Sequence, residues 1–134
     1  MTGQPRKMAA PTVASRLERR LIVMSDDGAL ISALRSRLPD GWQMIETRDL
    51  PEVGGFGDVL QCRFILLDLD ARESLDSMEV IRQVRGEMML NIPIFCFGGA
   101  PQLRDQARQA RADRFFERAE IIDKVAVFCE QFGW

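Results

Sequence analysis

FILLDLD, at residues 64–70, contains an uninterrupted apolar run that ends in two closely spaced aspartates. Such a short run predicts a strand buried on both faces of a parallel sheet. Leu75, Met78, Ile81 and Val84 follow it at helical spacing. This part of the chain therefore predicts a buried strand followed by a helix.

The same order recurs along the chain. Strands are predicted for five segments: 20–24, 42–47, 64–67, 92–97 and 114–117. Helices are predicted for residues 29–38, 75–84, 101–112 and from 121 onwards. Between residues 50 and 62, a proline and three glycines predict a helix that is short or broken. Repeated strand–helix units with short connections predict an α/β fold, with a doubly wound five-stranded parallel sheet and the alternating strand 42–47 near its edge.

The composition excludes several classes of protein. The chain has 134 residues, of which 46% are hydrophobic and 28% charged, as in an ordinary globular domain. No apolar run approaches the ~20 residues that cross a bilayer, and no secretory signal precedes the first strand, so we expect a cytoplasmic protein without a membrane partner. There is no histidine. A Ser-His-Asp triad, a histidine-ligated zinc and a phosphohistidine on this chain are therefore excluded.

Positive charge is concentrated at the start of the chain. The net charge is −2, yet residues 1–20 carry five basic side chains and one acidic one. Residues 1–17 lack a sustained hydrophobic period, which predicts a disordered basic N-terminal tail ahead of a folded domain at residues 18–134. Because no aromatic side chains are interleaved with the basic ones, the tail is not expected to bind nucleic acid.

Aspartates follow two of the predicted strands. Asp26 and Asp27 follow the first strand, and Asp68 and Asp70 follow the third. In the strand order 2-1-3-4-5 these strands are neighbours about 4.8 Å apart, and ligands of such sheets bind beyond the carboxyl ends of the strands. Clustered carboxylates favour a hard divalent cation such as Mg²⁺. The alternative is that Asp27 and Asp70 are loop or helix-cap residues.

From residue 21 to residue 134, the chain resembles the receiver domain of two-component response regulators, which has a flavodoxin-like fold. The resemblance rests on four segments together: LIVMSDDGAL (21–30), FILLDLDARES (64–74), IPIFCFGGA (92–100) and ADRFFERAE (112–120). It implies that Asp68 is the phospho-acceptor, and that Asp26, Asp27 and Asp68 are the metal-binding carboxylates. Ser25 stands where receivers have the first acidic residue of the pair, so Mg²⁺ binding is expected to be weak.

Three residues depart from the receiver pattern: Gly98, Arg118 and Ala119. The fourth strand of a receiver usually ends in Thr or Ser, where this chain has Gly98, and the fifth ends in Lys followed by a cis-proline, where this chain has Arg118-Ala119. Phe115 falls at the switch-aromatic position and is expected to be permanently buried. Glycine supplies no hydroxyl, and arginine lacks the compact ammonium group. We therefore expect a stand-alone degenerate receiver, or pseudo-receiver, in which Arg118 pairs with Asp68 or Asp26 in the resting protein.

Two alternatives remain open. The first is a conventional receiver in a phosphorelay, a phosphoprotein modified on Asp68 in the presence of Mg²⁺. The second follows from Asp68-Leu69-Asp70, which also resembles the first motif of haloacid-dehalogenase-type phosphatases, although Ala71-Arg72 stand where that family has Gly-Thr. An acidic loop at residues 25–28 repels phosphate, so neither flavin nor nucleotide is expected. We expect that the chain is not an enzyme.

A stripe of positive charge predicts a contact surface. It lies on the helix 101–112 and the strand after it, and consists of Arg104, Arg108, Arg111 and Arg114. In receivers the fourth helix, fifth strand and fifth helix contact partners and form homodimers. The resemblance thus implies a histidine kinase, a downstream effector or a second copy of the chain as partner. The alternative is a solvated face whose arginines pair with Asp105 and Asp113.

Overall fold

Residues 18–134 are described by the computed structural model of the chain. They form one five-stranded sheet in the order β2-β1-β3-β4-β5, and every neighbouring pair is parallel. The strands are β1 (Arg19–Met24), β2 (Trp42–Glu46), β3 (Ile65–Asp68), β4 (Ile94–Phe97) and β5 (Arg114–Phe116). The predicted sheet, its order and the edge position of the second strand are confirmed.

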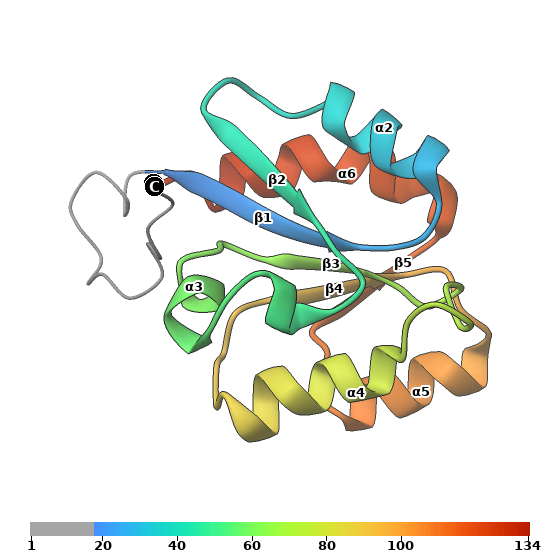
Figure 1. Cartoon of the computed structure of the whole chain (residues 1–134). Helices are drawn as coiled ribbons and strands as arrows, with labels where there is room; N and C mark the ends of the chain where they lie inside the picture. The colour runs from blue at the N-terminus through green and yellow to red at the C-terminus, as the bar shows by residue number, and fades with distance from the viewer. Residues whose placement is uncertain (1–17) are drawn as a thin grey trace.

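Helices cover both faces of the sheet (Figure 1). They are α2 (Gly28–Ser36), α3 (Phe56–Leu60), α4 (Ser77–Arg82), α5 (Pro101–Gln109) and α6 (Arg118–Gln131). In Figure 1, α2 and α6 lie on one face, and α3, α4 and α5 on the other. Their starts follow the sequence: Asp27 and Asp76 cap α2 and α4 by accepting backbone N–H bonds, and Pro101 opens α5.

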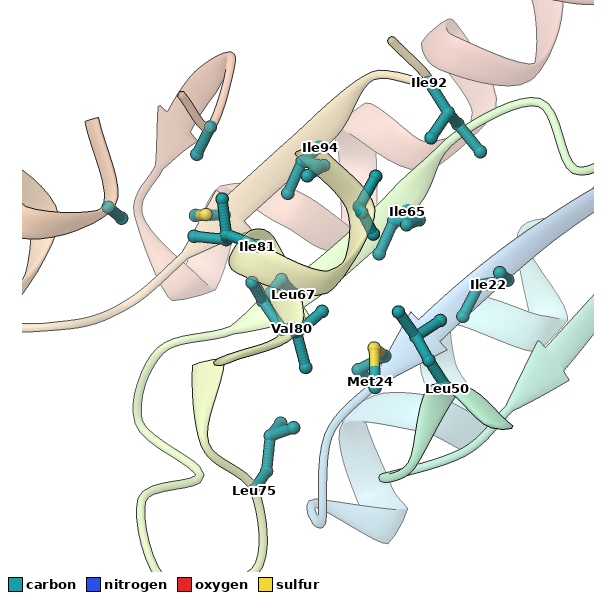
Figure 2. Packing of buried hydrophobic residues seen from close by; sticks show 14 of the residues in the cluster. Ile22, Met24, Leu50, Ile65, Leu67, Leu75, Val80, Ile81, Ile92 and Ile94 are labelled. Atoms are coloured by element: carbon teal, nitrogen blue, oxygen red, sulfur yellow. The ribbon is translucent and has the colours of Figure 1, made fainter. Parts of the chain in front are cut away.

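The alternation of side chains along the strands builds two cores. Ile22, Ile65 and Ile94 belong to the core on the α4 side, as Figure 2 shows, where they lie near Val80 and Ile81. Phe64 and Phe95 belong to the other core and pack against Phe128 of α6, with ring centroids 5.8 and 4.4 Å from that of Phe128. The three cysteines are buried in these cores, and burial raises the pKa of each thiol to about 12. They act as small hydrophobic side chains.

The predicted broken helix between residues 50 and 62 is confirmed. It consists of a single 3₁₀ turn, η2 (Leu50–Glu52), and the five-residue α3. Gly54 separates the two with φ +136°, a conformation that favours glycine.

The helix predicted for residues 75–84 begins two residues later and ends in an unexpected way. A π-helical turn, η3 (Gln83–Glu87), follows α4, and the Met88 N–H donates to the carbonyl of Gln83 at 2.8 Å. Arg85 lies in this turn with its guanidinium buried. It donates to the carbonyls of Leu90 and Ile92 and forms an ion pair with Asp113 at 2.6 Å. Local hydrophobic periodicity carries no sign of this wider turn.

The boundary between the fifth strand and the last helix also differs from the prediction. We expected the strand to reach residue 117 and the helix to start near 121. Instead, β5 ends at Phe116 and α6 begins at Arg118, with only Glu117 between them. The Glu120 side chain accepts a bond from the Glu117 N–H at 2.7 Å and so starts the helix early.

Among residues 18–134, no helix is long and apolar enough to cross a membrane. The predicted disordered tail at residues 1–17 lies outside the described residues.

Candidate functional site

Asp68 ends β3 at the carboxyl edge of the sheet and has no exposed surface. A buried carboxylate is costly unless its oxygens are hydrogen-bonded and its charge is compensated. Ser25 Oγ donates to Oδ2 at 2.6 Å, and the Asp70 N–H donates to Oδ1 at 2.9 Å. Arg118 Nη1 donates to the same Oδ1 at 2.7 Å. The charge of Asp68 is thus balanced by protein groups alone.

Arg118 contacts three carboxylates at once. Besides Asp68, its Nη2 donates to Asp27 Oδ2 at 2.7 Å, and its Nη1 lies 3.2 Å from Asp70 Oδ2. The hydrogen bonds to Asp68 and Asp27 raise the pKa of Arg118 above its ordinary value. The bond from Arg118 and the one from the Leu30 N–H lower the pKa of Asp27. The expected pairing of Arg118 with Asp68 is present, whereas its second expected partner, Asp26, is replaced by Asp27 and Asp70.

The early start of α6 brings Arg118 to this position. A cation in the first turn of a helix is disfavoured by the helix dipole, because the unpaired N–H groups there are already positive. Three carboxylates from the ends of β1 and β3 offset that cost. The guanidinium also lies 5.5 Å from the centre of the Phe97 ring, at the end of β4.

The described residues do not fit the expected Mg²⁺ site. Two of the three expected ligands, Asp27 and Asp68, are bonded to the Arg118 guanidinium. The third, Asp26, is exposed and accepts a bond from Ser74 Oγ at 2.8 Å. Within residues 18–134, no group of three or more acidic, cysteine or histidine side chains is arranged to hold a metal ion. Asp27 has the alternative role we considered, as the cap of α2, and contacts Arg118 as well.

The structure gives a steric reason for glycine at position 98. Its φ is +72°, and a Cβ at this position would lie 2.1 Å from Asp70 Oδ2. The Asp70 carboxylate therefore fills the space beside the end of β4, and its Oδ1 accepts a bond from the Gly99 N–H at 3.0 Å. Sequence reasoning missed this role of Asp70. It had considered Asp70 as a carboxylate of the acidic cluster, as a loop or cap residue, and as part of a phosphatase-like D-x-D motif.

Phe115 and Arg108 form one contact at the surface. Phe115 is half-buried rather than fully buried, and the Arg108 guanidinium lies over one side of its ring, 4.6 Å from the ring centre. Arg108 also pairs with Asp105 at 2.8 Å, as the alternative of a solvated face anticipated. Asp113 pairs with Arg85, outside the stripe.

The predicted positive stripe is not uniform. Arg104 points inward: its Nε donates to the carbonyl of Gly98 at 2.9 Å, and its Nη2 donates to that of Phe116 at 3.0 Å. Arg111 and Arg114 are exposed. The available positive surface is therefore formed by Arg108, Arg111 and Arg114, whereas Arg104 holds the loop after β4.

Solved structures similar to this chain are response regulators. The receiver domain from Bermanella marisrubri aligns with a TM-score of 0.67 and 24% identity over 86% of this chain and 97% of its own. The phosphorylated cyanobacterial phytochrome response regulator RcpA aligns with a TM-score of 0.67 and 16% identity, over 84% of this chain and 92% of its own. The chain has the fold of a response regulator receiver domain. The Mn²⁺-bound form of the response regulator Rcp1 shares this receiver fold, with a TM-score of 0.63 and 14% identity over 83% and 91%.

No protein-family model and no curated protein sequence matches the chain. The likeness to the solved structures, at 14–24% identity, shows the fold of this chain and not the role of any residue.

Proposed function

We propose that this chain is a receiver-like signalling domain of the two-component type that Arg118 holds in one resting state. In this proposal the domain acts by being bound by a partner, and phosphorylation of Asp68 does not switch it. The observation that carries the proposal is the bonding of Arg118 to Asp68 and Asp27, both at 2.7 Å.

The resting contacts of the Asp68 carboxylate compete with the contacts that a phosphoryl group on Asp68 could make. Modification of one Asp68 oxygen would disturb either the bond from Ser25 at Oδ2 or the bond from Arg118 at Oδ1, and hydrogen bonds to charged groups contribute about 1.5–3 kcal/mol each. In an intact receiver, a hydroxyl and an ammonium group would compensate by binding the new phosphoryl oxygens. Gly98 supplies no such hydroxyl. Because a shift from roughly 1:99 to 99:1 needs about 5.5 kcal/mol, the absence of that one hydroxyl contact removes about a quarter to a half of the bias toward a switched state.

The partner is proposed to be a signalling protein, such as a histidine kinase or a downstream effector, or a second copy of this chain. The surface of α5, β5 and α6 supports this, because Arg108, Arg111 and Arg114 present positive charge there. The absence of enzymatic activity and a cytoplasmic location remain predictions of the sequence.

Acetyl phosphate with Mg²⁺ tests the proposal, with intact mass as the readout. We expect the wild type to remain unmodified and Arg118→Lys, which restores the residue usual in receivers, to gain one phosphoryl group. Asp68→Asn in the Arg118→Lys background is the control and should remain unmodified. Modification of the wild type as fast as Arg118→Lys would favour the conventional receiver.

The comparisons give the phosphatase alternative no support. Turnover of an aryl phosphate would be the observation in its favour.

A further inference from the structure

Asp70 connects three elements that are far apart in the sequence. Its backbone follows β3, its Oδ2 lies 3.2 Å from Arg118 Nη1 at the start of α6, and its Oδ1 accepts the Gly99 N–H after β4 at 3.0 Å. Each carboxylate oxygen therefore has its own partner. A side chain placed in this way fixes the separation of its two partners.

The contacts continue from the loop after β4 to α5. The Gly98 carbonyl accepts a bond from Arg104 Nε at 2.9 Å, and the Gly98 N–H donates to the carbonyl of Phe116 at 3.1 Å. Arg104 also forms an ion pair at 3.3 Å with Glu117, the residue that directly precedes Arg118. The position of this loop is thereby tied both to the acidic site and to the base of α5.

Asp70 and a side chain at position 98 exclude each other. A Cβ at Gly98 would lie 2.1 Å from Asp70 Oδ2 and 2.8 Å from its Cγ, well inside van der Waals contact. Any residue other than glycine must push the carboxylate away. Its contacts with Arg118 and with the Gly99 N–H would then be lost together.

We propose that Asp70 is a positioning residue that holds Arg118 and the loop at residues 98–100 in one arrangement, and that position 98 is glycine to make room for its carboxylate. This inference rests on the proposed function for its meaning in signalling, since it would keep the α5 surface in a single state. The geometric coupling of Asp70, Gly98 and Arg118 can be tested without any partner.

A double-mutant cycle with a matched glycine control tests the coupling. Gly98→Ala, Asp70→Ala and the double variant are compared with Gly41→Ala. Gly41 has φ +87°, and a Cβ there would meet only Arg19 Nη1 at 3.6 Å. Both alanines thus carry the strain of a left-handed backbone, but only the one at 98 meets Asp70. We expect Gly98→Ala to lower the folding equilibrium constant about tenfold more than Gly41→Ala, and this excess to disappear in the Asp70→Ala background.

NMR spectra provide a readout that a loss of stability alone would not change. In folded Gly98→Ala, the Gly99 amide and the Arg118 guanidinium signals should both shift, whereas Gly41→Ala should leave both in place. If Gly98→Ala does not fold, Asp70→Ala should shift the same two sets of signals. Equal costs for the two glycine variants, an excess that persists without Asp70, or unchanged Arg118 signals would overturn the inference. Because no phosphodonor is used, these outcomes are independent of the acetyl phosphate test.

Discussion

At the scale of single residues, Arg118 supplies the positive charge beside the buried Asp68 carboxylate. We expect Arg118→Ala to lower the free energy of unfolding by about 3 kcal/mol, the lower end of the cost of breaking a buried pair, because Asp68 is fully buried whereas Arg118 is 33% exposed. Urea unfolding measures this. Arg82→Ala is the control, since solvent screens the exposed pair of Arg82 with Glu79 and its loss should cost much less. Equal effects of the two variants would mean that Arg118 does not stabilise the buried charge.

Asp27 makes the stability depend on pH. Its pKa is lowered by the bonds from Arg118 and from the Leu30 N–H, so the unfolded chain binds a proton at Asp27 more readily than the folded one. Its contribution is therefore complete above the ordinary value of 3.8 and is lost as pH falls through the lowered pKa. We expect Asp27→Asn to be less stable than the wild type at pH 7, with a smaller gap at pH 3. Urea unfolding at both values measures the gap, and a gap that widens in acid would contradict this account.

Only some of the contacts of Arg118 could be predicted from the sequence. The pairing of Arg118 with Asp68 could be predicted, because Asp68 ends β3 and Arg118 comes shortly after β5, at the same carboxyl edge of the sheet. That Asp70 rather than Asp26 faces Arg118 could not be predicted, since it depends on side-chain directions in two loops and on the space left by Gly98.

At the scale of elements, the strands were predictable because apolar and alternating runs mark them directly. The π-helical turn was not, because the bonds that hold Arg85 in this turn reach two other segments, residues 90–92 and 111–113. The early start of α6 was missed for a similar reason: a single Glu120 side-chain bond moves the boundary by three residues. Interactions between distant segments leave no period in the sequence.

Arg85 provides a prediction for this turn. We expect Arg85→Met to lower the free energy of unfolding by about 2–6 kcal/mol, because it leaves two buried carbonyls, those of Leu90 and Ile92, without their Arg85 donor at about 1–3 kcal/mol each. It also removes the ion-pair partner of Asp113, whose Oδ2 keeps the bond from the Ile94 N–H. Arg37→Met, which breaks an exposed pair with Asp123, should cost less than about 1 kcal/mol. Thermal or urea unfolding distinguishes the two. A loss below about 1 kcal/mol for Arg85→Met would show that the turn holds without its buried guanidinium.

At the scale of the whole molecule, the chain has the receiver fold, and Arg118 pairs with two of the three carboxylates that were expected to bind a metal. This predicts little stabilisation by Mg²⁺. A cation bound with a millimolar Kd would add about 1.4 kcal/mol at roughly tenfold excess. We expect Mg²⁺ to leave the unfolding midpoint of the wild type equal to that in NaCl of matched ionic strength. A rise that Asp68→Asn removes would show that Mg²⁺ displaces Arg118.

The central claim is that Arg118 holds this receiver fold in one state that phosphorylation does not switch. The most direct measurement is an NMR titration of the wild type with beryllofluoride and Mg²⁺, followed at Asp68, Gly98 and Phe115. We predict no saturable shift at these residues, with Arg118→Lys as the variant in which shifts become possible. Saturable shifts in the wild type that extend from Asp68 to Phe115 would contradict the claim and establish a working phosphorylation switch.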